Sequence, residues 1–207
     1  MGRTSDAKLR LLTAVMDLIL EQNYGSATVD AICERAKVKK GSFYYFFKSK
    51  GELAAAALEH NWECKREAMD ALFSPTVPPL ERLENFFIKT YQTQVECKKE
   101  KGNVLGCPMF TLGSEVSTQE PELRQKVEEL INRYICYLTS AIRDAKSEGL
   151  IEIDDPHERA RNIFAYFEGA LTQARILNDP EILRGFSEDV FKLVGAFNSL
   201  KLEKSTS

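Results

Sequence analysis

The stretch that decides the fold runs from Thr28 to Leu53 and reads TVDAICERAKVKKGSFYYFFKSKGEL. Thr28 predicts a helix start, because a threonine hydroxyl at the N-cap accepts a hydrogen bond from a backbone N–H of the first turn. Apolar side chains behind it recur at helical spacing, which predicts a short amphipathic helix ending at Ala36. A polar turn, Lys37–Lys40, leads into a second short helix that begins near Lys39–Gly41. Two short helices joined by a tight turn predict a helix-turn-helix unit.

The polar side chains of this unit match the chemistry of DNA binding. Thr28 leaves backbone N–H groups at a helix start, where a phosphate oxygen can dock. Gly41 removes a side chain where the backbone and DNA come close, and hydroxyl groups on the second helix can donate to phosphates or base edges. A solvated lysine-rich turn between packed helices is the alternative interpretation. The predicted DNA-binding residues are Thr28, Lys39, Lys40, Gly41, Ser42, Tyr44, Tyr45, Lys48 and Lys50.

This stretch resembles the DNA-binding signature of the TetR family of transcriptional regulators, IAxxAGVSxGxxYxHF followed by Ser-Lys-x-x-Leu. Two positions depart from it, because Lys37 replaces the common glycine of the turn and Phe46 replaces a common His or Tyr. The resemblance implies a three-helix head, a larger helical body, and a homodimer that binds a palindromic double-stranded DNA operator. The matching residues are Thr28, Ile32, Ala36, Val38, Gly41, Ser42, Phe43, Tyr44, Phe47, Ser49, Lys50 and Leu53.

Outside this stretch, apolar residues recur at helical spacing almost throughout, so the sequence predicts an all-α fold of about nine helices. Residues 1–50 are expected to form an N-terminal three-helix helix-turn-helix domain. Residues 51–207 are expected to form a C-terminal helical bundle for ligand binding and dimerisation. Besides the two short helices, we expect helices over residues 5–22, 49–72, 80–98, 107–117, 121–147, 156–178 and 180–201.

The distribution of charge supports this division. The whole chain of 207 residues has a formal net charge of −3, but residues 1–50 hold nine Lys or Arg against five Asp or Glu. The first 50 residues therefore carry +4 and the remaining 157 carry −7. Such asymmetry indicates a local contact with a polyanion and excludes a protein that coats nucleic acid along its whole length.

Composition argues against other classes. The five cysteines form no CxxC pair and only two histidines accompany them, so no zinc site or disulfide framework is expected. No cofactor is expected either, and no glycine-rich phosphate loop, nucleophile elbow or HExxH motif indicates an enzyme. Without a signal peptide or a membrane-spanning apolar run, we expect a cytoplasmic protein with no membrane partner. An enzyme and a helical adaptor that binds only proteins remain the two rival interpretations.

The body is expected to bind a small-molecule effector. Pockets in helical bundles are mostly apolar with a few polar anchors, although core packing is the alternative for each aromatic residue taken singly. The effector itself, the operator, the regulated genes and the choice between repression and activation stay open, with repression the usual behaviour of the family. The candidate pocket residues are Trp62, Phe87, Tyr91, Cys107, Met109, Phe110, Tyr134, Tyr137 and Phe167.

Cys107 has a second interpretation. It precedes Pro108 at a predicted helix start, where the helix dipole stabilises a thiolate. The segment GCPMFTLGSEVS also resembles a sub-group of the family that includes regulators of electrophile and oxidant responses. Cys107 is therefore either a reactive sensor thiol or a small apolar residue beside a turn.

The last two predicted helices carry wide apolar stripes. One flank of each stripe is expected to pack on the subunit's own core, and the other to pair across a two-fold axis as a four-helix bundle. A single thick core within one subunit is the alternative. The candidate dimer residues are Phe164, Leu171, Ala174, Phe186, Val190 and Phe197.

Overall fold

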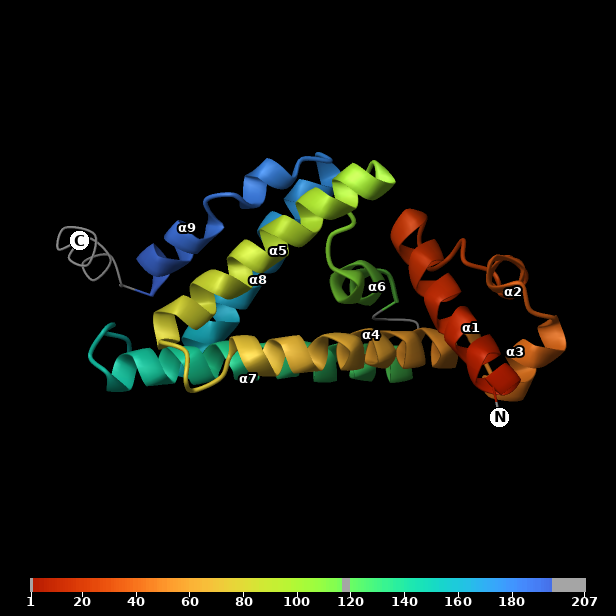
Figure 1. Ribbon diagram of the computed structural model, residues 1–207, viewed down its shortest axis with the longest axis horizontal. Coiled ribbons are helices and arrows are strands. Elements are labelled where there is room, and N and C mark those ends of the chain that lie inside the picture. The colour runs from red at the N-terminus through yellow and green to blue at the C-terminus, as the bar shows by residue number, and fades with distance from the viewer. Residues whose placement is uncertain (1, 117–119, 195–207) are drawn as a thin grey trace. The chain divides into compact units, whose positions relative to one another are not determined.

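The structure is a computed structural model that describes residues 2–116 and 120–194 (Figure 1). Within these ranges the all-α prediction is confirmed: the chain forms helices, and no strand occurs there. No helix in the described part is long and apolar enough to cross a membrane. The α-helices are α1 (Gly2–Glu21), α2 (Val29–Ala36), α3 (Lys40–Phe46), α4 (Lys50–Leu72), α5 (Pro79–Lys101), α6 (Pro108–Val116), α7 (Pro121–Ser147), α8 (Pro156–Ile176) and α9 (Phe186–Leu193), and a 3-10 helix, η1 (Pro180–Leu183), lies between α8 and α9.

Local signals set the ends of several helices. The Asp155 carboxylate caps α8 by accepting from the backbone N–H groups of His157 and Glu158, at 2.8 and 3.2 Å. Helix α5 begins at Pro79, which has no N–H to leave unsatisfied in a first turn. It ends before Gly102, whose φ of 77° lies in the left-handed region that glycine enters without strain. These ends fall close to those predicted from the sequence.

The prediction of a single helix over residues 180–201 is wrong. The Asp179 carboxylate accepts from the N–H of Glu181 at 3.1 Å and caps η1, and the chain leaves helical geometry at Gly185 before α9 begins. Glycine loses much conformational freedom in a helix, so a break there is favourable. The part of the prediction beyond Val194 lies outside the described residues.

The chain divides into two compact units. Unit 1 comprises residues 1–67 and 107–131, and unit 2 comprises residues 68–106 and 132–207. Helices α4 and α7 each contribute residues to both units. The division by compactness therefore differs from the functional boundary expected at residue 50, which remains a prediction about function.

Unit 1 is organised around α1, which contacts α2, α3 and α6. Leu11, Val15 and Ile19 follow each other at four-residue spacing along one face of α1, and all three are fully buried. Ile32 of α2 and Phe43 of α3 are also fully buried. This small core fixes the two helices of the helix-turn-helix on α1.

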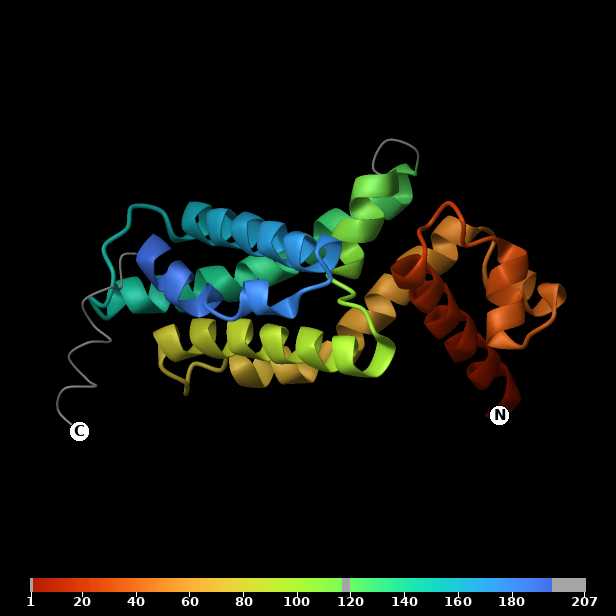
Figure 2. The ribbon, with the colours of Figure 1, turned by 90° about the horizontal axis from the view of Figure 1, so that it is seen from above.

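Unit 2 has an aromatic core, in which α5, α8 and α9 run beside one another (Figure 2). The ring of Phe86 lies 5.8 Å from that of Phe73, 6.3 Å from that of Tyr134 and 5.4 Å from that of Phe167. Tilted rings at these separations add to the free energy gained from burying their area.

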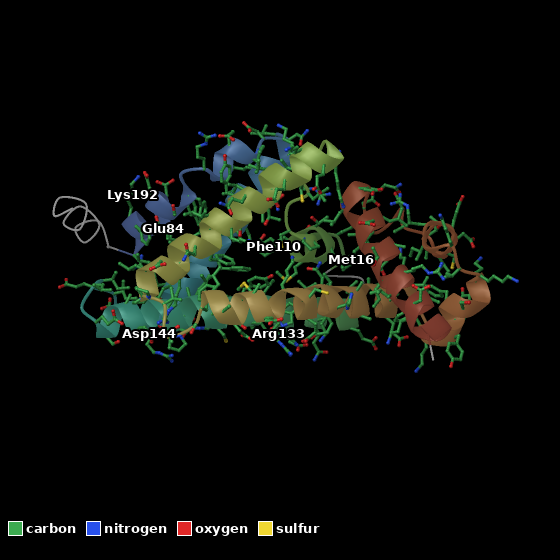
Figure 3. The ribbon with its side chains drawn as sticks, viewed as in Figure 1. Met16, Glu84, Phe110, Arg133, Asp144 and Lys192 are labelled. Carbon is green, nitrogen blue, oxygen red and sulfur yellow. The ribbon has the colours of Figure 1, made fainter. Side chains whose placement is uncertain are left out.

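One buried ion pair joins α5 to α7 within unit 2. The Arg82 guanidinium, which is almost fully buried, donates to Asp144 at 2.5 Å and to the Val77 carbonyl oxygen at 2.6 Å. Asp144 is labelled on α7 in Figure 3. A buried cation held by two acceptors costs much less than an unpaired one.

Candidate nucleic-acid interface

The helix-turn-helix begins at a capped helix start. Thr28 has an extended backbone, and its hydroxyl oxygen accepts from the backbone N–H of Ala31 at 3.2 Å. Helix α2 follows directly, so the N-cap predicted at Thr28 is confirmed. The first turn of α2 leaves further backbone N–H groups at this end, which is the geometry that can receive a phosphate oxygen.

The turn between α2 and α3 is closed by two features. Lys37 adopts the left-handed conformation, with φ 53° and ψ 46°, at the position where the family signature has glycine. The Arg10 guanidinium of α1 donates to the carbonyl oxygens of Ala36 and Lys37, at 3.1 and 3.2 Å. A cation at this end of α2 satisfies carbonyl groups that the helix leaves free. The sequence pattern does not indicate this role of Arg10, because its partners are backbone atoms far along the chain.

Helix α3 presents its two tyrosines to solvent. Phe43 is fully buried, whereas 59% of Tyr44 and 75% of Tyr45 are exposed. The rings of Phe43 and Tyr44 pack edge to face, with 5.1 Å between their centres, so the buried Phe43 ring contacts the exposed Tyr44 ring. One face of this short helix therefore holds the core, while the other offers two hydroxyl groups and two aromatic rings to a partner.

Gly41 has no structural reason to be glycine within the chain. Its φ is outside the positive range, and a Cβ built on it would meet no atom within 4 Å. The residue is exposed in the first turn of α3. Open space at this point permits the close approach of an external backbone.

The predicted lysines differ in their surroundings. Lys39, Lys40 and Lys48 are exposed. The Lys40 ammonium pairs with Asp30 of α2 at 2.7 Å, and this hydrogen bond raises the pKa of Lys40. Because both side chains of the pair are largely exposed, a phosphate can replace the carboxylate at little cost.

Lys50 is placed differently from the other predicted lysines. Its ammonium donates to the backbone carbonyl oxygen of Tyr24 at 2.7 Å and lies 3.9 Å from the centre of the Tyr24 ring. Burial lowers the pKa of this lysine. The structure therefore gives Lys50 an internal partner, and its predicted phosphate contact has no support from this geometry.

The predicted effector residues fall into separate groups. In unit 2, Phe87 lies 5.4 Å from Phe167, and Phe86 links this pair to Tyr134. Tyr137 joins the same cluster through Phe73, at 5.2 Å between ring centres. Unit 1 holds four further candidates, of which Trp62 and Met109 are buried and Cys107 and Phe110 are half-buried.

Tyr91 is not part of the aromatic cluster. Its hydroxyl donates to Glu181 at 2.9 Å, and the Arg184 guanidinium lies 6.0 Å from its ring centre. These partners give Tyr91 a role in holding η1 to α5.

Cys107 immediately precedes α6, as its sequence context predicted. Its carbonyl oxygen accepts from the backbone N–H and the hydroxyl of Thr111, both at 3.0 Å. Within unit 2, the preceding loop is fastened by side chains: Gln94 accepts from the N–H of Gly106 at 3.1 Å, and Arg175 donates to the Leu105 carbonyl oxygen at 3.0 Å. The chain therefore enters α6 from a well-bonded loop.

The predicted dimer residues face inward. Five of them are buried against the chain's own core, because the apolar stripes of the last two helices are wide enough to fill it. Phe197 lies outside the described residues. The apolar residues that α8, α9 and the residue after α8 leave exposed are instead Tyr166, Ile176, Leu177 and Leu193.

The helix-turn-helix with outward-facing tyrosines and lysines, joined to a helical body, defines a helix-turn-helix transcriptional regulator. Residues 11–57 match the model of bacterial regulatory proteins of the tetR family. Residues 79–189 match the tetracyclin repressor-like C-terminal domain. The chain belongs to the TetR family, and the resemblance seen in the sequence is confirmed.

Known relatives agree with this assignment. The chain is 27% identical over 179 residues to the transcriptional regulator AcuR of Cereibacter sphaeroides, covering 86% of this chain and 80% of AcuR. It is 26% identical over 194 residues to the HTH-type transcriptional repressor DhaR of Mycobacterium sp. (strain GP1), covering 93% of each. The crystal structure of the regulatory protein TetR from Rhodobacter sphaeroides superposes with a TM-score of 0.79 at 26% identity, covering 90% of this chain and 98% of that one.

Proposed function

We propose that this chain is a repressor that binds a palindromic operator as a homodimer and leaves it when a small apolar or electrophilic effector binds the body. The observation that carries the proposal is the face of α3, where Tyr44 and Tyr45 stand in solvent above the buried Phe43. Exposed aromatic rings beside lysines are typical of a surface that meets another molecule. The relative DhaR, which is described as a repressor, supports repression.

The contacts with DNA divide into two kinds. The helix start at Thr28 and the exposed lysines Lys39, Lys40 and Lys48 would meet phosphates, which positions the head without reading sequence. The side chains on the outer face of α3 would reach base edges in the major groove. These reading side chains are Ser42, Tyr44 and Tyr45.

A homodimer would present two copies of α3 to successive major grooves. This requires the two helices to stand roughly 34–36 Å apart, which is one turn of the duplex. The exposed apolar side chains of α8, α9 and the residue after α8 are the proposed contact between subunits, and Tyr166 and Leu177 share one face of this region.

Effector binding would act by favouring a different spacing of the two heads. A ligand shifts this equilibrium only through its difference in affinity for the two states. A coupling of about 1–3 kcal/mol would change operator affinity roughly 5- to 150-fold. The aromatic residues of the body are the proposed walls of the effector site, and a tilt of α4 is the proposed movement.

Cys107 is proposed as the thiol that an electrophilic effector modifies. Its place before α6 supports this role, since a helix start stabilises a thiolate. The test is mass-spectrometric labelling of the native protein with a mild electrophile. Cys107 should react faster than Cys33, which is buried, and than Cys136, which is exposed. Equal or slower labelling than at Cys136 would leave Cys107 a packing residue.

Operator binding tests the proposed function as a whole. A gel shift with the DNA upstream of the protein's own gene should give a sharp complex that weakens as salt rises. A scrambled duplex of equal length is the control. A protein adaptor or an enzyme would bind both fragments equally weakly, and this result would reject the proposal.

A further inference from the structure

Tyr24 connects the DNA-binding head to residues of unit 1 that follow α5 in the chain. It lies between α1 and α2 and is 5% exposed. The carboxylate of Glu115, on α6, accepts two backbone N–H groups, that of Tyr24 at 2.8 Å and that of Gly25 at 2.7 Å. Charge-assisted hydrogen bonds to both oxygens of one carboxylate are among the stronger polar contacts in proteins.

A second carboxylate holds the side chain of Tyr24. The Tyr24 hydroxyl donates to Glu120, just before α7, at 2.5 Å. The Tyr24 carbonyl oxygen accepts from the Lys50 ammonium at 2.7 Å. The backbone N–H, the carbonyl and the hydroxyl of this one residue therefore each have a side-chain partner, and burial together with Glu120 raises the pKa of the Tyr24 hydroxyl.

Two glycines leave room for the two carboxylates. A Cβ built on Gly51 would lie 2.1 Å from an oxygen of Glu120, and one built on Gly25 would lie 3.3 Å from an oxygen of Glu115. Neither glycine has a positive φ, so backbone conformation does not require them. The close approach of the carboxylates is a physical reason for glycine at both positions.

These contacts bracket the helix-turn-helix. Tyr24 and Gly25 lie just before Thr28, and Lys50 and Gly51 lie just after α3. The end before α2 is therefore bonded to both carboxylates, whereas the end after α3 is bonded to Tyr24 through Lys50 and lies close to Glu120 at Gly51. Because most exposed ion pairs contribute little, the burial of Tyr24 distinguishes this group of residues from a solvated surface network.

We propose that Glu115 and Glu120 are positioning residues for operator binding. They hold Tyr24 and Gly25 before α2 and, through the bond from Lys50 to Tyr24, the end after α3, and so set the orientation of α3. This inference rests on the proposed function. Neither residue touches DNA. Their loss loosens the head relative to the rest of unit 1, and a dimer that must place two heads at a fixed spacing then binds its operator more weakly.

The first experiment compares Glu115→Ala and Glu120→Ala with wild type. Each variant is titrated with the upstream fragment and with the scrambled duplex at one salt concentration. The temperature is kept well below the midpoint of thermal unfolding of that variant. We expect operator affinity to fall roughly fivefold or more and affinity for the scrambled duplex to stay unchanged. A residue that served stability alone would leave both affinities of the folded protein unchanged.

Glu63→Ala is the matched control. Glu63 pairs with Arg66 at 3.0 Å on α4 in the same unit, and both side chains are exposed. It should bind both fragments as wild type does. An equal loss of operator affinity in this control would overturn the proposal, because any lost carboxylate would then suffice.

The second experiment uses Gly51→Ala alone and combined with Glu120→Ala. The added methyl group displaces the flexible Glu120 side chain and breaks its bond to Tyr24. We expect Gly51→Ala to weaken operator binding in the wild-type background and to add nothing once Glu120 is alanine. Additive effects would show that Gly51 acts independently of the carboxylate, which contradicts the proposal.

If Glu115→Ala does not fold, Tyr24→Phe and hydrogen exchange decide. Tyr24→Phe removes one hydroxyl and should reduce the ratio of operator to scrambled affinity in the same direction as Glu120→Ala. In Glu120→Ala the backbone N–H of Tyr24 should exchange faster than in wild type.

The two proposals can be rejected separately. A wild-type protein that does not bind the operator rejects the proposed function, whereas wild-type binding with unaffected variants rejects only this inference.

Discussion

At the scale of single residues, two lysines of the head show how one residue type serves different ends. Lys37 closes α2 in the left-handed region, where a side chain with a Cβ is strained. Lys50 turns its ammonium onto Tyr24 instead of outward. Neither role follows from charge alone, and each can be tested by one substitution.

Lys37→Gly should stabilise the protein. Glycine enters the left-handed region without strain, and we expect this gain to outweigh the greater conformational freedom that glycine loses on folding. The free energy of unfolding should therefore rise by about 0.5–1 kcal/mol. Urea denaturation measures the change. Lys39→Gly, at an extended N-cap position, is the control and should give no gain. An unchanged or lower stability for Lys37→Gly would contradict the strain.

Lys48→Ala and Lys50→Ala should weaken operator binding in different ways. An exposed lysine that neutralises a phosphate contributes about one unit to the salt dependence of binding for each head, so Lys48→Ala should flatten that dependence. Lys50→Ala should lower affinity and leave the slope unchanged, because its ammonium bonds Tyr24. Lys89→Ala, exposed in unit 2, is the control for both measurements. A flattened slope for Lys50→Ala would restore its predicted phosphate contact.

At the scale of elements, the short helix α3 owes its place to its neighbours. Phe43 and Phe47 pack beneath it, and Lys40 pairs across to α2. An isolated helix of this length is unstable in water. Tertiary packing therefore holds the reading helix, and its outer face is free to vary in sequence at little cost in stability.

Gly41→Ala should separate folding from binding. Alanine favours a helix over glycine by up to about 1 kcal/mol, and no atom obstructs the methyl group, so stability should hold or rise. Operator affinity should fall about tenfold or more, because the added methyl group would push α3 away from the DNA and weaken neighbouring base contacts, each worth roughly 1–3 kcal/mol when well formed. Gly185→Ala, also in open space but in unit 2, should bind as wild type. Unchanged affinity for Gly41→Ala would remove this residue from the interface.

Arg82→Met should destabilise unit 2. It removes the buried partner of Asp144. Breaking a fully buried ion pair costs about 3 kcal/mol or more, and we expect a smaller loss of stability here because the Asp144 side chain is 30% exposed. Urea denaturation should show this loss. Arg143→Ala is a close control, because Arg143 pairs with the same carboxylate at 3.9 Å from an exposed position and should cost less than about 0.5 kcal/mol. Equal effects would contradict the role of the buried pair.

At the scale of the whole molecule, the proposed function requires two subunits. The described residues of α8 and α9 bury the stripe that was expected to form the interface, and expose a smaller set of apolar side chains. A palindromic operator needs a two-fold symmetric protein, so dimerisation and operator binding should be lost together.

Leu177→Glu should yield a monomer. Leu177 is 66% exposed, so a charge there leaves the fold of one subunit intact but is disfavoured in an apolar interface. Light scattering should give half the wild-type mass, and operator binding should weaken. Ile88→Glu, on the partly exposed face of α5, is the control and should remain dimeric. A dimeric Leu177→Glu protein would place the interface elsewhere.

Local patterns explain what could be predicted. Thr28 caps α2, Cys107 precedes α6 and Asp155 caps α8 because each signal acts on backbone groups within one turn. Over residues 180–201 the local pattern predicts one helix wrongly, because η1 and Gly185 interrupt an apolar pattern that continues in phase. Helical periodicity describes which residues face a core and does not by itself require an unbroken helix.

The sequence by itself determined the all-helical class, the helix-turn-helix and the family, because spacing, caps and signature are properties of neighbouring residues. Only the tertiary structure decided that Lys50 bonds Tyr24, that Glu115 binds the turn before α2, and that the expected dimer stripe is buried. Each of these joins groups separated by tens of residues. Such contacts depend on how helices pack, and helix packing sets which of several equally apolar or charged faces meets which partner.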